Sequence, residues 1–109
     1  MAYDKKLTDR MRVALGRVQS VTERKMFGGI AFMVRGNMCC GVIDDRMMVR
    51  VGPLAYEKAL KLSHAGPMDF TGKSMRGFVY IAPEGVRTAR QLQAWVQRGL
   101  DFVETLPAK

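Results

Sequence analysis

The last quarter of the chain carries the strongest structural constraint, an apolar stripe with the period of an α-helix. Thr88 and Gln91 have the spacing of a capping box, which predicts a helix start. The helix is expected to run to about Leu106 and to stop before Pro107. Its apolar face comprises Leu92, Trp95, Val96, Gly99, Phe102, Val103 and Leu106. A stripe this wide must pack against another layer. Because Gly99 lowers helix propensity, its place in the stripe indicates a close approach to that layer.

A second helix with one apolar face is predicted at the other end, from about Asp4 to Val18. Its apolar positions are Leu7, Met11, Ala14, Leu15 and Val18. Lys6, Arg10 and Arg17 gather on the opposing side, with Arg12 further round. This helix is therefore expected to pack by one face and to present cations on another.

Short β-like segments fill most of the middle of the chain. They lie at 21–27, 30–35, 38–43, 47–51 and 75–82, with a short edge strand at 68–71. Gly36–Asn37 and Asp44–Asp45–Arg46 are turn signals, so the strands around them should return antiparallel. A short helix is expected from Pro53 to Ser63. Residues 1–109 thus predict one α+β domain, with a mostly antiparallel sheet of about five strands flanked by N-terminal and C-terminal helices.

The two cysteines, Cys39 and Cys40, are neighbours and are the only cysteines in the chain. On a regular strand they would point to opposite faces, so no disulfide framework is expected. That usage fits a reducing cytosol. No apolar run approaches the roughly 18 residues of a membrane span, and the N-terminus does not resemble a signal peptide. We therefore expect a cytoplasmic protein that does not contact the membrane.

The charge balance is strongly basic, with 18 lysines and arginines against 10 acidic residues and a net charge of +8. The candidate contact residues lie in the first quarter and are Lys6, Arg10, Arg17, Arg24 and Lys25. Such a surface favours polyanionic partners, although a basic surface that is merely solvated is the alternative. No helix-turn-helix or zinc finger is recognisable, so weak, salt-sensitive nucleic-acid contact is expected rather than sequence reading.

No group with an obvious chemical role emerges from the sequence. His64 is the only histidine, and one histidine with two adjacent cysteines cannot supply a zinc site. We predict no catalytic, cofactor-binding or metal-ligating residue, and therefore no enzyme and no cofactor. Met33 and Met48 are the best candidates for a sticky patch on the sheet.

Two other possibilities remain open from the residues alone. A small-molecule binder or enzyme could use a pocket lined by Phe70, Phe78 and Tyr80 beside Arg76. A homo-oligomer could form by pairing of sheet edges or of the Met-rich face.

An ordered set of short motifs resembles the N-terminal domain of the TfoX/Sxy family of bacterial competence regulators. The signature is the run 25–32, which contains Met26, Phe27, Gly28 and Gly29. It is followed in order by motifs at 36–38, 47–52, 67–70 and 72–79 and by Trp95. The resemblance implies an α+β fold with a central antiparallel sheet.

In larger relatives the resemblance implies a coactivator of transcription that works in DNA-uptake competence with a cyclic-AMP-responsive activator. Those relatives carry a second, C-terminal helical domain, which this sequence, ending at Lys109, is expected to lack. The function expected here is therefore a non-enzymatic regulatory module that binds a protein partner, with a transcription activator as one candidate.

Overall fold

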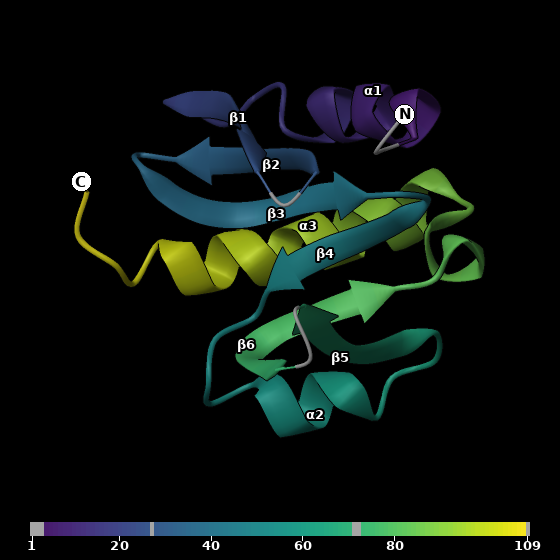
Figure 1. The fold of residues 1–109 in the computed structure, drawn as a ribbon. Helices are drawn as coiled ribbons and strands as arrows, with labels where there is room; N and C mark the ends of the chain where they lie inside the picture. Colours follow the sequence, from purple (N-terminus) through teal and green to yellow (C-terminus); the bar gives the residue numbers. More distant parts are fainter. Residues whose placement is uncertain (1–3, 27, 71–72, 109) are drawn as a thin grey trace.

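The sheet and helices expected from the sequence are present in a computed structural model, which describes residues 4–26, 28–70 and 73–108. These residues form a six-stranded antiparallel sheet with the strand order β1-β2-β3-β4-β6-β5, together with three α-helices (Figure 1). The elements in chain order are α1 (Lys5–Ala14), β1 (Val21–Met26), β2 (Gly29–Val34), β3 (Asn37–Ile43), β4 (Arg46–Arg50), α2 (Tyr56–Leu60), β5 (Ala65–Phe70), β6 (Lys73–Ile81), the 3-10 turn η1 (Pro83–Val86) and α3 (Ala89–Val103). The α+β prediction is confirmed, with six strands where about five were expected.

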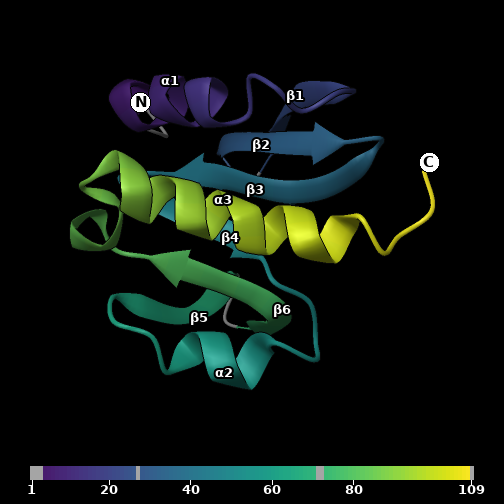
Figure 2. The same ribbon diagram turned by 180° about the vertical axis from the view of Figure 1, so that it is seen from behind.

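The helix α3 lies across one face of the sheet and forms the centre of the main core. It contacts β3 and β4, while α1 packs beside β3 and α3, and α2 packs against β5 and β6 (Figures 1 and 2). The predicted capping box is present. The Thr88 hydroxyl oxygen accepts a hydrogen bond from the backbone N–H of Gln91, and the Gln91 side-chain oxygen accepts one from the backbone N–H of Thr88. The predicted stripe is buried at Leu92, Trp95 and Val96. This face of α3 therefore anchors the helical layer to the sheet.

Gly99 marks the place where α3 comes closest to the sheet. A methyl group added there would lie 2.9 Å from the carbonyl oxygen of Cys39 and 3.0 Å from its Sγ atom. It would also lie 3.3 Å from a methyl group of Val49 on the next strand. The predicted close approach is confirmed, since no larger residue fits without movement of the β3 backbone.

Strand β3 contains a bulge that changes the side of the sheet on which one cysteine lies. Phe32 pairs with Cys40, whereas Met33 pairs with Met38, so Cys39 is the extra residue between them. Cys39 and Cys40 are both fully buried and both belong to the core cluster beneath α3. The prediction that they point to opposite faces is wrong, because a bulge interrupts the alternation of side chains.

Several element boundaries differ from the sequence-based expectation. The tight turn between β2 and β3 is Arg35–Gly36, one residue earlier than predicted, and both residues have positive φ, 51° and 84°. The helix expected from Pro53 to Ser63 is reduced to α2, Tyr56–Leu60, because Pro53 lies in a turn ahead of it. The last strand pair begins earlier, since β5 starts at Ala65.

Both terminal helices end earlier than their apolar stripes suggest. α1 ends at Ala14 and α3 at Val103, and turns follow each of them. Val18 and Leu106 nevertheless pack against the main core. The stripes therefore predicted burial correctly beyond the point at which the helical hydrogen bonds stop.

The sheet face opposite α3 carries a second apolar cluster. Its buried members are Ala31, Ile43, Met48, Met68 and Tyr80, with Met33, Met38 and Phe78 partly buried beside them. The Arg46 guanidinium lies 4.0 Å from the centre of the Tyr80 ring and covers this cluster at one end. Met33 is partly exposed as expected, but Met48 is fully buried, so the prediction of an exposed patch at Met48 is wrong.

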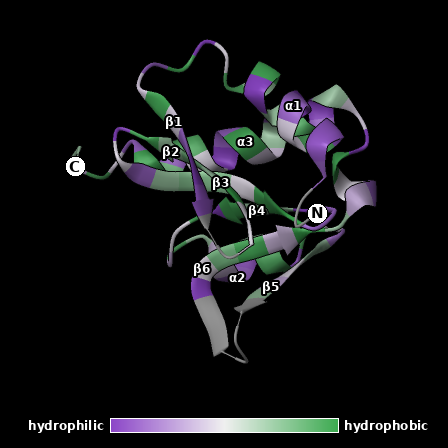
Figure 3. Cartoon of the chain, turned by 45° about the horizontal axis from the view of Figure 1, so that its top comes forward, coloured by the Kyte–Doolittle hydropathy of each residue, from purple (hydrophilic) through white to green (hydrophobic). Residues whose placement is uncertain are grey.

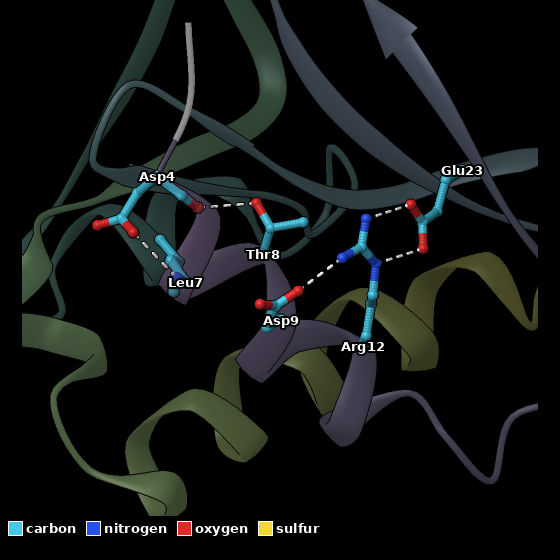
Figure 4. A network of polar contacts seen from close by, with 6 residues as sticks. All are labelled: Asp4, Leu7, Thr8, Asp9, Arg12 and Glu23. Carbon is cyan, nitrogen blue, oxygen red and sulfur yellow. Dashed lines mark hydrogen bonds and ion pairs between the residues drawn. The ribbon is translucent and has the colours of Figure 1, made fainter. Parts of the chain in front are cut away.

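A polar network fixes the orientation of α1 against β1 (Figure 4). Asp4 caps the helix, because its carboxylate accepts a hydrogen bond of 3.2 Å from the backbone N–H of Leu7. Arg12 donates to both carboxylate oxygens of Glu23 on β1, at 2.7 and 2.8 Å, and to Asp9 at 2.6 Å. The hydrogen bonds from Arg12 lower the pKa of Glu23. The Arg12–Glu23 pair thus links α1 to β1.

Replacing Glu23 with glutamine is expected to lower the thermal midpoint by about 4 °C or less at neutral pH, because the ion pair is exposed to solvent. A carboxylate whose pKa is lowered by folding stabilises the fold above its unfolded pKa, and this contribution is lost as the pH falls. The difference between the wild type and Glu23→Gln should therefore disappear on acidification. Thermal unfolding followed by circular dichroism at several pH values measures this, and a difference that grows at acid pH would contradict it.

Candidate interaction surface

The five cations predicted as contact residues do not form one patch. Lys6 and Arg10 lie on α1, and Arg17 lies in the turn that follows it. Arg24 pairs with Ala31 and so lies on the sheet face opposite α3, whereas Lys25 pairs with Ile30 and lies on the same face as α3. Figure 3 shows β1 as hydrophilic over most of its length. Lys6 and Arg10 lie one helical turn apart on α1, whereas Arg24 and Lys25 lie on opposite faces of β1.

Arg10 is not a solvated cation on the outer side of α1, as the helical pattern suggested. Its guanidinium donates to the carbonyl oxygen of Val86 at 2.6 Å and to that of Arg87 at 3.2 Å. These carbonyls end η1 and lead into α3, so Arg10 ties α1 to the start of α3 across 76 residues of sequence. The residue has a structural role, and its positive charge remains at the junction of the two helices.

A groove lies beside this junction, between α1 and the first half of α3. It has a volume of about 250 Å³ and is lined by Arg10, Val13, Ala14, Ala89, Leu92 and Gln93. We call it the α1–α3 groove. Val13 is 82% exposed, although it is a large apolar side chain. The two helices run side by side here, as Figure 2 shows, and they contact each other.

Three more cations lie close in the sequence to residues that line the α1–α3 groove. Lys6 lies one helical turn before Arg10, and Arg87 and Arg90 lie at the start of α3; all three are exposed. Within residues 4–26, 28–70 and 73–108, the ion pairs found are those of Arg12, so Lys6, Arg87 and Arg90 have no acidic partner there. Among the same residues, none with an acidic side chain lines the groove. Most of the residues that line the α1–α3 groove are therefore apolar, and the charged residue among them, Arg10, is a cation.

Two further hollows flank the loop between α1 and β1. One, of about 470 Å³, is lined by Val18, Gln19, Ser20, Val34, Arg35, Leu100 and Glu104. The other, of about 440 Å³, shares Val18 and Ser20 with the first. Each carries one arginine and one glutamate, and in the second these are Arg12 and Glu23, which bind each other. Because each hollow carries one positive and one negative side chain, its charges favour neither a cationic nor an anionic ligand.

Among the residues considered for an aromatic pocket, those that the structure describes do not gather around Arg76. The ring of Tyr80 is covered by Arg46, and Arg76 lies over the ring of Tyr56 on α2 instead. Phe78 lies beneath Arg50, with 5.6 Å between the guanidinium carbon and the ring centre. The Phe70 side chain lies outside the described part of the chain. The arginine and the aromatic rings proposed for that pocket therefore point to different partners.

The signature residues lie at the connection between β1 and β2. Met26 ends β1, Gly29 begins β2, and Gly28 between them has a φ of 74°, a conformation that favours glycine. Phe27 lies outside the described residues. A methyl group on Gly29 would overlap the carbonyl oxygen of Val42, so Gly29 permits β2 to lie against β3. These glycines have a structural role in the described part of the molecule.

The sequence did contain a signal for the α1–α3 groove, namely Val13. It lies out of phase with the apolar stripe of α1, so an amphipathic helix would not require an apolar side chain there. The residues that complete the groove, Ala89, Leu92 and Gln93, come from the far end of the chain. Only the packing of α1 against α3 shows that they meet.

No helix among the described residues has the length and apolar character needed to cross a lipid bilayer. No group of three or more histidine, cysteine, aspartate or glutamate side chains among them is arranged to hold a metal ion.

A comparison with protein families gave one match. Residues 14–103 match the model of the TfoX N-terminal domain. Neither a curated protein nor a solved structure matches the chain.

Proposed function

Because the chain belongs to the TfoX N-terminal domain family, we propose that it is a small regulatory module that acts by binding a protein partner rather than by catalysis. The observation that carries this proposal is the α1–α3 groove, a mostly apolar surface with an exposed valine and one cation, Arg10, in its lining. Apolar side chains surrounded by charges are typical of surfaces that bind other proteins. The module would work in the cytoplasm of a bacterium, in the regulation of transcription for competence.

The positive charge of the surface determines the kind of partner. With a net charge of +8, the protein attracts acidic partners at long range and repels basic ones. A transcription activator with an acidic surface is the partner we propose, and direct contact with DNA would be weak and sensitive to salt.

The intact protein, immobilised through a C-terminal tag, is expected to retain a specific protein from a lysate of the bacterium that carries its gene. Retention should be strong at low salt and should weaken as salt rises, because unpaired cations contribute to the association. Mass spectrometry of the retained proteins, with a tagged lysozyme of similar basic charge as control, identifies what is specific. Recovery of no protein above the control, even at low salt, would contradict the proposal.

The link to competence needs a separate measurement in cells. Deletion of the gene should lower the transcript levels of DNA-uptake genes, and re-expression of the intact chain should restore them. Unchanged transcripts in the deletion strain would remove the competence role but leave partner binding to be decided by the pull-down.

A further inference from the structure

The α1–α3 groove has the features of a site for one kind of ligand. Val13 and Leu54 are the exposed large hydrophobic residues found in the described part of the chain. Leu54 lines none of the hollows described above, whereas Val13 forms the rim of the α1–α3 groove beside Leu92. An exposed valine next to an apolar floor is costly to leave in water, and burial against a partner's apolar side chain removes that cost.

The size of the groove argues against a small molecule. Pockets for drug-sized ligands and cofactors usually have volumes of about 300–1,000 Å³ and enclose most of the ligand. The α1–α3 groove, at about 250 Å³, is smaller and lies open along two helices. It has room for apolar side chains that project from a neighbouring chain.

The charge around the groove selects the partner's chemistry. Arg10 lines the groove, Lys6 lies one helical turn before it on α1, and Arg87 and Arg90 lie within two residues of Ala89, which also lines the groove. The N-terminus of α3, where Ala89 lines the groove, adds the positive end of a helix dipole. A nucleic acid would satisfy these charges but offers no aliphatic side chain for the floor. An acidic peptide with an apolar edge satisfies both.

We propose that the α1–α3 groove binds an amphipathic helix of a protein partner, with apolar residues facing Val13 and Leu92 and acidic residues facing the surrounding cations. The proposal rests on the interaction-module function and specifies its partner. Recognition of this kind, in which a helix lies in a groove and inserts residues spaced three and four apart, recurs among peptide-binding proteins. The groove between two packed helices supplies the matching shape.

The test uses a defined probe, a fluorescein-labelled helical peptide of 18 residues with leucines spaced three and four apart and glutamates on both sides. Fluorescence anisotropy with the intact protein is expected to show saturable binding that a peptide with lysine in place of glutamate does not show. Val13→Asp should weaken binding at least tenfold, because it places a negative charge against the acidic peptide and removes an apolar contact. Leu54→Asp, the same type of change at the other exposed hydrophobic residue, should leave binding within twofold.

A pair of charge reversals separates local from general attraction. Lys6→Glu with Arg90→Glu is expected to weaken binding at least tenfold. Lys58→Glu with Lys61→Glu makes the same change in net charge on the exposed side of α2 and should have much less effect. Circular dichroism of each variant confirms that it remains folded, which is expected because all of these side chains are exposed.

Three results would overturn the groove as the site: equal weakening by the two double variants, no effect of Val13→Asp, or no saturable binding of the acidic peptide by the wild type. Displacement of the peptide by single-stranded DNA, with DNA binding unaffected by Val13→Asp, would also count against an apolar docking site. A partner retained equally by the wild type and by Val13→Asp in the pull-down would place the interaction elsewhere and leave the proposed function standing. A pull-down that recovers no partner contradicts the function itself.

Discussion

Replacing Gly99 with leucine is expected to destabilise the protein by at least about 3 kcal/mol and to leave little folded protein at 37 °C. Even the first added carbon would lie 2.9 Å from the Cys39 carbonyl oxygen and 3.0 Å from its Sγ atom. Relief of that overlap requires α3 to move away from β3, which would open the main core around it. Leucine is among the better helix formers, so the loss cannot be attributed to helix propensity. Urea unfolding followed by circular dichroism measures the difference.

Two alanine variants make the test of Gly99 specific. Gly99→Ala should destabilise by about 1–3 kcal/mol, despite the roughly 1 kcal/mol that alanine adds within a helix. Gly66→Ala is the matched control, because a methyl group on Gly66 would have no atom within 4 Å. That variant should unfold within about 0.5 kcal/mol of the wild type. A Gly99→Ala protein that is more stable than the wild type would show that the helix does not contact β3 as described.

Cys39 and Cys40 are expected to react with a thiol reagent such as 5,5′-dithiobis(2-nitrobenzoate) at least ~10³-fold more slowly in the native protein than in denaturant. Both side chains are fully buried under α3, so the reagent must wait for the chain to open. For a domain of ordinary stability, about 5 kcal/mol or more, the open fraction is below roughly 10⁻³. The rate of colour release at increasing urea concentrations measures this protection. Rapid reaction of one thiol without urea would contradict the burial of both.

Because Cys39 and Cys40 are buried together, we expect the protein to lose stability in alkaline solution. The hydrogen bond with the Cys39 side chain and burial both raise the pKa of the Cys40 thiol in the folded state. The neutral thiol therefore contributes its full stabilisation below roughly pH 8.5, where an unfolded thiol begins to ionise. Above that pH the contribution is lost by up to about 1.4 kcal/mol for each pH unit. Cys40→Ala should make the free energy of unfolding fall less steeply as the pH rises. If the substitution only destabilised the fold in general, the free energy of unfolding would be lower at every pH, with the same slope.

The fold was largely predictable because its main signals are periodic and local. The stripe from Leu92 to Leu106 and the capping box of Thr88 located α3. In β6, Val79 and Ile81 belong to the core beneath α3 and Tyr80 to the cluster on the other face, as the alternation of a regular strand requires. Each of these patterns depends on spacing within one element, which the sequence displays directly.

What the sequence did not reveal depends on contacts between distant elements. The bulge that brings Cys39 and Cys40 to the same face of the sheet arises where β3 pairs with β2. The sequence of residues 37–43 contains no pattern that predicts it. Arg10 looks like any solvent-exposed position of an amphipathic helix, yet it binds carbonyls 76 and 77 residues away. The α1–α3 groove was missed for the same reason, because half of its lining comes from each end of the chain.

The two outermost strands of the sheet determine whether molecules of this protein can pair edge to edge at high concentration. An outermost strand has unpaired amides and carbonyls that can recruit an identical neighbour and start a fibril. The outer strand β1 carries two exposed cations, Arg24 and Lys25, which repel the same residues of an identical strand. The other outer strand, β5, contains Pro67, which has no amide hydrogen to donate. Strand-by-strand growth is thereby discouraged at both sides. Contact between molecules through their sheet edges is therefore disfavoured by the residues of β1 and β5 themselves.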